Sequence, residues 1–199
     1  EVTLRQAGIP YVVVGGQDFF ERAEVRDIIS YLKVIVNPRD EAAFLRVVNM
    51  PRRGVGDATL HKIHELCRDG KLSLGQATAQ LLKQGLDGAP TQLALGETPD
   101  EKIRHYKEQK TERGLRDFLR LLDTYRKKFR EKKGTLREVV EDLIRAIDYH
   151  GELVRTCKTP QQVANRWNNI EVVVKAVGDY EEKAEEPSLS GFLDESHLN

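Results

Sequence analysis

The sequence predicts a mainly α-helical, multi-helix protein with one short strand near its N-terminus, and three observations support this class. Apolar residues recur at three- and four-residue spacing through most of the chain. Only one β-branched run, at 11–14, ends in a glycine pair, as a short strand would. The composition, 39% apolar and 32% charged, is ordinary for a soluble helical protein.

The first half of the chain divides into short elements. Residues 2–7 are typical of the end of a helix, and the strand at 11–14 follows. Asp40 is placed to act as an N-cap for the helix after it. Helices are predicted at 22–36, after Asp40, at 57–67 and at 74–82.

The second half contains longer helical patterns. Residues 85–100 hold Gly, Pro, Asp and Thr without a clear period, which predicts a loop or local insertion. We expect this loop or insertion to span 85–111. Thr159 and Pro160 are typical of an N-cap and a first helical turn. Helices are predicted at 110–132, 136–149 and 160–185, with a short final one at 188–198.

The charge is balanced overall but unevenly distributed. Lys plus Arg and Asp plus Glu both number 32, so the net charge is zero and a whole-chain basic signature for nucleic acid is absent. Residues 101–133 contain thirteen Lys or Arg against six Asp or Glu, whereas 179–195 contain seven acids and one lysine. Only local patches can therefore serve polyanions.

Motifs for chemistry are missing from the sequence. It contains no phosphate-binding GxxxxGK[ST] loop, HExxH, GxSxG or CxxC. His61 and His64 lie three residues apart but lack an obvious partner ligand, so surface histidines are the favoured interpretation. We therefore expect no catalytic, cofactor-binding or metal-binding residue in this chain.

One positive signal stands out, at Pro51-Arg52-Arg53-Gly54-Val55-Gly56 with Thr59 after it. Glycines permit a tight turn, and the helix that follows presents unpaired N–H groups and a partial positive charge. With two arginines and a hydroxyl beside it, this corner is suited to phosphate. The residues alone leave open a plain turn between helices with solvated arginines.

A longer pattern surrounds this corner and resembles the UvrD/Rep/PcrA family of superfamily 1 helicases, with Rep-like members the most similar. The residues that carry the resemblance are Gly8-Ile9-Pro10-Tyr11, Phe19-Phe20-Glu21-Arg22, Asn37-Pro38-x-Asp40, Phe44-x-Arg46-x-x-Asn49, Pro51 through Leu60, and Ser188-Leu189-Ser190-Gly191-Phe192-Leu193. Up to Leu60 the match is continuous and specific, and beyond it the match is looser.

The resemblance implies the helical subdomain called 2B, which contacts duplex DNA and regulates unwinding. It implies that residues 1–18 end subdomain 2A, that 19–187 form 2B, and that 188–199 return toward 2A. ATP and Mg²⁺ would be bound elsewhere in a full-length, bacterial, cytoplasmic and nucleoid-associated 3′-to-5′ helicase of replication or repair. Partners would be duplex DNA through its phosphates, single-stranded DNA in the parent, other helicase subdomains and replication or repair proteins, with no membrane.

Carried over by position, the resemblance implies duplex contacts at Arg53, Gly54, Gly56 and Thr59, with Arg52 beside them. The isolated chain would then not be catalytic and would bind no ATP. The alternative hypothesis, favoured by the zero net charge and the acidic tail, is a protein–protein interaction module that regulates a motor without binding DNA.

Overall fold

The computed structural model describes residues 17–86 and 98–198. Within these ranges the chain forms helices and no strand, which confirms the mainly α-helical class. The expected helix end at 2–7 and strand at 11–14 lie outside the described residues. The helices are α2 (Gln17–Phe20), α3 (Ala23–Val36), α4 (Glu41–Val47), α5 (Asp57–Gly70), α6 (Leu74–Gln84), α7 (Pro99–Arg130), α8 (Leu136–Ala146), α9 (Tyr149–Thr156), α10 (Pro160–Lys183) and α11 (Leu189–Leu198).

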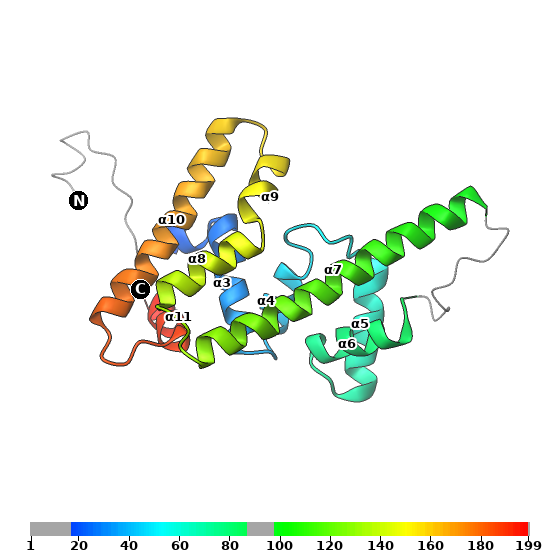
Figure 1. Ribbon diagram of the computed structural model, residues 1–199, viewed down its shortest axis with the longest axis horizontal. Helices are drawn as coiled ribbons and strands as arrows, with labels where there is room; N and C mark the ends of the chain where they lie inside the picture. Colours follow the sequence, from blue (N-terminus) through cyan, green and yellow to red (C-terminus); the bar gives the residue numbers. More distant parts are fainter. Residues whose placement is uncertain (1–16, 87–97, 199) are drawn as a thin grey trace.

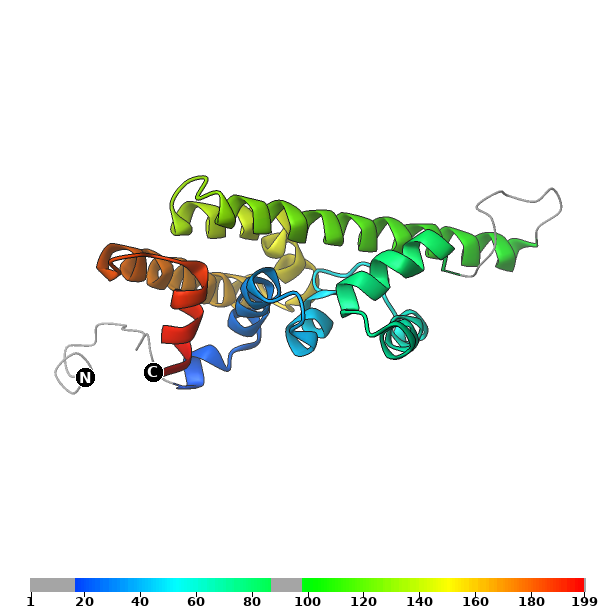
Figure 2. The same cartoon turned by 90° about the horizontal axis from the view of Figure 1, so that it is seen from below.

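The long helix α7 organises the molecule. It contains 32 residues and runs along the length of the structure, with α5 and α6 beside its N-terminal half and α8 near its C-terminal end (Figure 1). The helices α3, α10 and α11 pack on one another in the part of the molecule away from α5. Seen from below, α7 forms one edge and most other helices lie to one side of it (Figure 2).

Side-chain caps set several helix starts. The Asp40 carboxylate accepts a hydrogen bond from Ala43 N at 2.9 Å, which confirms Asp40 as an N-cap. Thr159 accepts from Gln162 N at 3.2 Å, as expected. Reciprocal capping boxes open three more helices, where a Ser or Thr side chain and a Gln or Glu three residues later each satisfy an orphan N–H group; the pairs are Ser73 and Gln76, Thr98 and Glu101, and Thr135 and Glu138.

Two expectations about helix boundaries are wrong. Helix α7 starts at Pro99, because Thr98 and Glu101 cap it and Pro99 fits its first turn. Residues 99–111 of the expected loop over 85–111 are therefore helical. The predicted helix at 136–149 is interrupted after Ala146, where Ile147 is the C-cap of α8. There Asp148 adopts a left-handed backbone (φ 52°) and caps α9, and this turn directs Tyr149 into the core.

The centre of the core joins three helices through aromatic side chains. Phe118 of α7 makes edge-to-face contacts with Phe44 of α4, at 5.5 Å between ring centroids, and with Tyr31 of α3, at 6.2 Å. All three rings are almost completely buried. Because such rings bury large apolar areas, these contacts fix α7 against the α3–α4 pair. That pair leads into the turn at residues 51–56, here named the glycine corner.

A second buried feature, the α3 polar cluster, consists of Glu24, Asp27, Tyr149 and Asn169, all between 3% and 6% exposed. Asn169 donates to Glu24 at 2.6 Å, and Tyr149 donates to Asp27 at 2.6 Å. Arg46 of α4 forms an ion pair with Asp27 at 2.7 Å. Burial raises the pKa of Asp27, and the bonds to Tyr149 and Arg46 oppose that shift. The cluster ties the start of α3 to α4, α9 and α10.

Candidate nucleic-acid interface

The glycine corner is the turn that connects α4 to α5, and the Asn49 side chain braces it from inside. The Asn49 carbonyl oxygen accepts hydrogen bonds from Arg53 N at 2.7 Å and from Val55 N at 3.3 Å. Its amide group donates to Val55 O at 2.9 Å. A single side chain thus satisfies three backbone groups of the turn, and the Met50–Pro51 peptide bond within it is cis.

Arg53 points into the protein. Its Nη1 donates to three carbonyl oxygens at the end of α4 and in the turn, those of Val47, Val48 and Pro51, at 2.9, 3.2 and 3.1 Å. Its Nη2 donates to the Tyr31 hydroxyl at 2.6 Å, and the guanidinium lies over the Phe118 ring at 4.8 Å from the centroid. The cation therefore stabilises the C-terminal end of α4 and holds the corner.

The neighbouring hydroxyl belongs to the same arrangement. Tyr31 donates to Met50 O while it accepts from Arg53. Burial raises the pKa of Tyr31 to about 12, and the charge of Arg53 acts in the opposite direction. The hydroxyl therefore stays protonated at neutral pH and remains a donor to the turn.

Helix α7 closes the corner from the other side. The Thr111 hydroxyl lies 2.9 Å from Gly54 O and 3.0 Å from Lys107 O. Gly54 has φ +80°, and a Cβ there would lie 2.8 Å from the Thr111 Oγ1. A Cβ on Gly114 would lie 2.9 Å from the Cβ of Arg53. Glycine is thus required at Gly54 by its backbone, and both glycines permit the close packing of α7 on the corner.

The N-terminus of α5 is left open by this packing. Its N-cap is Gly56, which supplies no side-chain hydrogen bond, and a Cβ on Gly56 would meet nothing within 4 Å. Thr59 N bonds to Gly56 O at 3.0 Å. Within the described residues, the N–H groups of Asp57 and Ala58 have no acceptor, because the first N–H groups of a helix have no intrahelical partner.

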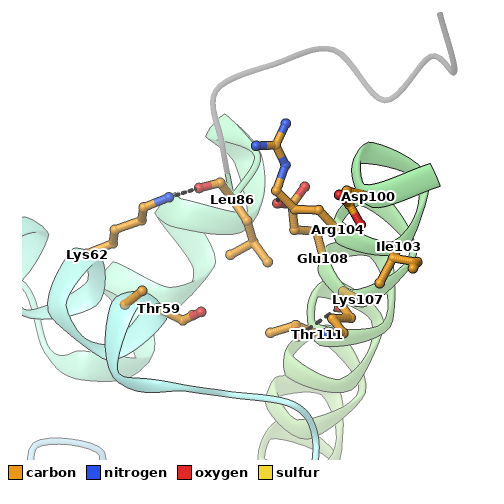
Figure 3. Close-up of a pocket in the computed structure, with 10 residues that line it drawn as sticks. Thr59, Lys62, Leu86, Asp100, Ile103, Arg104, Lys107, Glu108 and Thr111 are labelled. Atoms are coloured by element: carbon orange, nitrogen blue, oxygen red, sulfur yellow. Dashed lines mark hydrogen bonds and ion pairs between the residues drawn. The ribbon is translucent and has the colours of Figure 1, made fainter. Parts of the chain in front are cut away.

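A groove of about 460 Å³ extends from this helix end toward α7 (Figure 3). Three cations and two acids line it. Lys62 donates to Leu86 O, and Arg104 pairs with Glu108 at 3.8 Å. The groove is lined by Ala58, Thr59, Lys62, Leu86, Asp100, Ile103, Arg104, Lys107, Glu108 and Thr111. Its charge is therefore mixed, with a small excess of positive side chains.

The sequence-predicted residues fall into two groups in space. Gly54, Gly56 and Thr59 lie together around the start of α5, and Arg52 is exposed beside them with no side-chain partner among the described residues. Arg53 is engaged by the protein instead. Sequence reasoning missed Thr111 and Lys107, which come from a helix more than fifty residues away and carry no local signal.

No group of three or more His, Cys, Asp or Glu residues in the described ranges is arranged to hold a metal ion. His61 pairs with Glu65 at 3.7 Å across one helical turn. None of the described helices is both long and apolar enough to cross a membrane.

Comparisons with known proteins match the whole chain. The model of the UvrD-like helicase C-terminal domain matches residues 1–199. The chain is 31% identical to the ATP-dependent DNA helicase PcrA of Bacillus subtilis over 193 residues, which cover 97% of this chain and 23% of that protein. It is 34% identical to the ATP-dependent DNA helicase Rep of Salmonella typhimurium over 171 residues, which cover 85% and 22%.

A shorter stretch is more similar to a third relative. Over 84 residues, 42% of this chain and 12% of the relative, the chain is 50% identical to DNA helicase II of Escherichia coli. The chain thus spans less than a quarter of the length of each of these relatives. The family model and these relatives confirm the resemblance of the sequence, and the chain belongs to the UvrD-like helicase C-terminal domain family.

Proposed function

We propose that this chain is a duplex-DNA-contacting, regulatory 2B subdomain of an ATP-dependent 3′-to-5′ DNA helicase that acts in replication or repair. The observation that carries the proposal is the open start of α5. Two N–H groups there find no acceptor in residues 17–86 and 98–198, while the turn before them is held by Asn49, Arg53 and Thr111. ATP and Mg²⁺ would be bound by other parts of the parent helicase, as would single-stranded DNA.

The proposed contact is a phosphate held by backbone amides. The N–H groups of Asp57 and Ala58 and the dipole of α5 supply partial positive charge to one phosphate oxygen. Thr59 adds a hydroxyl, and Arg52 supplies a full charge from the exposed side of the turn. Arg53 acts as a positioning residue, because its guanidinium is occupied by the carbonyl oxygens beneath the turn.

This contact is independent of DNA sequence. Phosphates are the same at every step of the duplex, so amides and an arginine that touch them set position and orientation without reading bases. Such a grip suits a regulatory subdomain that holds the duplex ahead of a motor and works with neighbouring subdomains. The parent would act in the bacterial cytoplasm at the nucleoid.

Two substitutions test the contact without disturbing the turn. Gly56→Ser adds a good N-cap whose hydroxyl can bond to the amides that a phosphate would use, and the space around Gly56 accepts it. Arg52→Ala removes the exposed charge. We expect the double variant to fold at least as stably as the wild type but to bind a fluorescent 20-bp duplex more weakly in anisotropy titrations, with a salt dependence reduced by about one phosphate contact.

The matched control is Arg68→Ala, which removes an exposed charge near the other end of α5. It should bind duplex as the wild type does. Equal affinities of the double variant and this control at low salt would show that the corner is not a DNA contact. Capture of a protein partner that survives high salt, without any DNA binding at low salt, would support the protein-interaction alternative.

A further inference from the structure

Helix α7 carries a one-sided row of cations, here named the α7 stripe. At about 100° per residue, its members fall within about 120° of the helical wheel. They lie opposite the buried residues Leu115 and Phe118, and every one of them is exposed. The α7 stripe consists of Lys102, Lys110, Arg113, Arg116 and Arg120.

The charge of the α7 stripe is largely uncompensated. The acid on this face, Asp117, pairs with Arg120 at 3.8 Å. Within the part of the chain that the structure describes, the side chains of Lys102, Lys110, Arg113 and Arg116 have no ion-pair or hydrogen-bond partner. Three other acids on this half of α7 are engaged elsewhere: Glu101 caps the helix, Glu108 pairs with Arg104, and Glu112 accepts from Leu86 N.

The spacing of these charges opposes helix stability. Lys110, Arg113 and Arg116 are three residues apart, so like charges face one another across successive turns, an arrangement that destabilises a helix. The fold does not need them, because the buried face of α7 provides its packing. A polyanion bound along the stripe would remove this repulsion.

The composition of this face favours nucleic acid over protein as the polyanion. Cores of protein–protein interfaces are depleted of charged residues, whereas protein–DNA interfaces are strongly positive. The large apolar side chain on this face is Tyr106, which is 68% exposed. The stripe extends over roughly 27 Å of helix, a length that covers several phosphates of one strand.

The α7 stripe is separate from the glycine corner. The corner packs on Thr111 and Gly114, which lie toward the buried side of α7, whereas the stripe residues are exposed on the opposite face of the helix. We infer that the α7 stripe is a second, sequence-independent binding site for a nucleic-acid backbone. This inference does not depend on DNA binding at the corner.

The test uses the triple variant Lys110→Ala, Arg113→Ala and Arg116→Ala in the 199-residue chain. Alanine favours helix, so the variant should keep the helical content of the wild type by circular dichroism. The matched control removes two arginines and one lysine that are exposed elsewhere, by Arg39→Ala, Arg68→Ala and Lys175→Ala. Both variants change the net charge equally.

Binding of a fluorescent 20-bp duplex is measured by anisotropy between 50 and 200 mM salt. We expect the stripe variant to bind several-fold more weakly than the control, with a slope of log K against log salt smaller by about 2.7, since each phosphate contact contributes about 0.9. The same difference should appear in the Arg52→Ala, Gly56→Ser background, which separates the stripe from the corner.

Equal binding of the stripe variant and the control would overturn the inference, whatever the corner variant does. The inference would also fail if the stripe variant lost affinity for a poly-glutamate peptide but kept its affinity for DNA, because the partner would then be an acidic protein surface. Loss of binding in the corner variant alone would leave the proposed function in place and remove the stripe.

Discussion

The α3 polar cluster and the glycine corner contain similar polar side chains but differ in what those side chains leave unpaired. In the cluster, carboxylates, an amide and a hydroxyl bond to one another and to arginines, so polar groups are satisfied inside the protein. In the corner, Asn49 and Arg53 satisfy the turn and the end of α4, while the first amides of α5 have no acceptor in the part of the chain that the structure describes.

This difference in pairing determines which of the two regions can bind an anion. A network whose groups are all paired can only stabilise, because a ligand would have to displace an existing bond. A rigid turn that leaves N–H groups without acceptors at the surface is preorganised, so an anion can bind those groups at little further cost in conformational entropy. The predictions below test whether the two regions separate stability from DNA binding in this way.

The largest effect is expected in the cluster, from Asn169→Ala. This change removes the donor to Glu24 and the acceptor of Arg22, and leaves a carboxylate that is 5% exposed with one fewer partner. We expect the free energy of unfolding in urea to fall by about 2–3 kcal/mol, as is typical for the loss of a hydrogen bond to a buried charged group. Duplex affinity of the folded protein should not change.

Asn168→Ala is the control for this substitution, because Asn168 is the exposed neighbour on α10. It should leave stability within about 0.5 kcal/mol of the wild type. Equal stabilities of the two variants would mean that the cluster contributes nothing measurable to the fold.

The next effect compares the adjacent arginines of the corner. Arg53→Ala removes the hydrogen bonds to the end of α4 and the contact with Phe118, so we expect the free energy of unfolding to fall by about 2 kcal/mol. Its duplex affinity should fall while the salt slope stays the same. Arg52→Ala should leave stability unchanged and lower the salt slope of duplex binding by about 0.9, because it removes one phosphate contact.

Urea titrations and salt-dependent anisotropy on the two single variants measure both quantities. If Arg53→Ala lowers the salt slope and leaves stability intact, Arg53 contacts phosphate directly, as the family resemblance implies. That outcome would require the guanidinium to leave its internal partners when DNA binds.

Local signals in the sequence identified most of the fold. Helix starts could be predicted from the N-caps Asp40 and Thr159, and helix faces from the apolar spacing of α3, α5 and α10. Both signals are local, because caps and amphipathic faces depend on residues a few positions apart. The start of α7 was missed although Thr98, Pro99 and Glu101 form a standard capping box, because the apolar spacing begins only later, where α7 meets the core.

The candidate site was only partly predictable for a different reason. Gly54 and Gly56 identify the turn by themselves, but the direction of Arg53 depends on Tyr31 and Phe118, which lie far away in sequence. The support from Thr111 likewise depends on how α7 packs. Such long-range contacts leave no pattern in a single sequence. The sequence alone therefore cannot show that Arg52 is exposed while Arg53 is half-buried and bonded to the protein.

A smaller effect is expected where α7 supports the corner. Thr111→Val keeps the shape of the side chain but removes the hydroxyl that bonds to Gly54 O, so we expect a loss of about 1 kcal/mol in stability and a modest loss of duplex affinity. Thr124→Val on the same helix is the control, because its hydroxyl bonds only to the carbonyl of Arg120 at an exposed position. An equal loss of affinity in both variants would contradict a specific role for Thr111.

The smallest effect is expected at Asp142, a carboxylate that is neither buried in the core nor part of the glycine corner. Asp142 accepts from Lys128 and, at 2.7 Å, from Tyr125, and its side chain is 42% exposed. The hydrogen bond from Lys128, followed by that from Tyr125, holds the pKa of Asp142 below its ordinary value of 3.8. The ionised carboxylate therefore stabilises the folded state above the unfolded pKa, and this contribution disappears as pH falls through the lower folded pKa.

Asp142→Asn removes that titration. We expect the variant to be less stable than the wild type at pH 6 by about 0.2–1 kcal/mol, as for other exposed pairs, and the difference to narrow as the pH falls below about 4. High salt should also narrow it, since the pair is open to counterions. Urea unfolding from pH 6 to pH 2.5 measures the difference. A gap that persists unchanged at the lowest pH would show that Asp142 acts through the shape of its contacts and not through its charge.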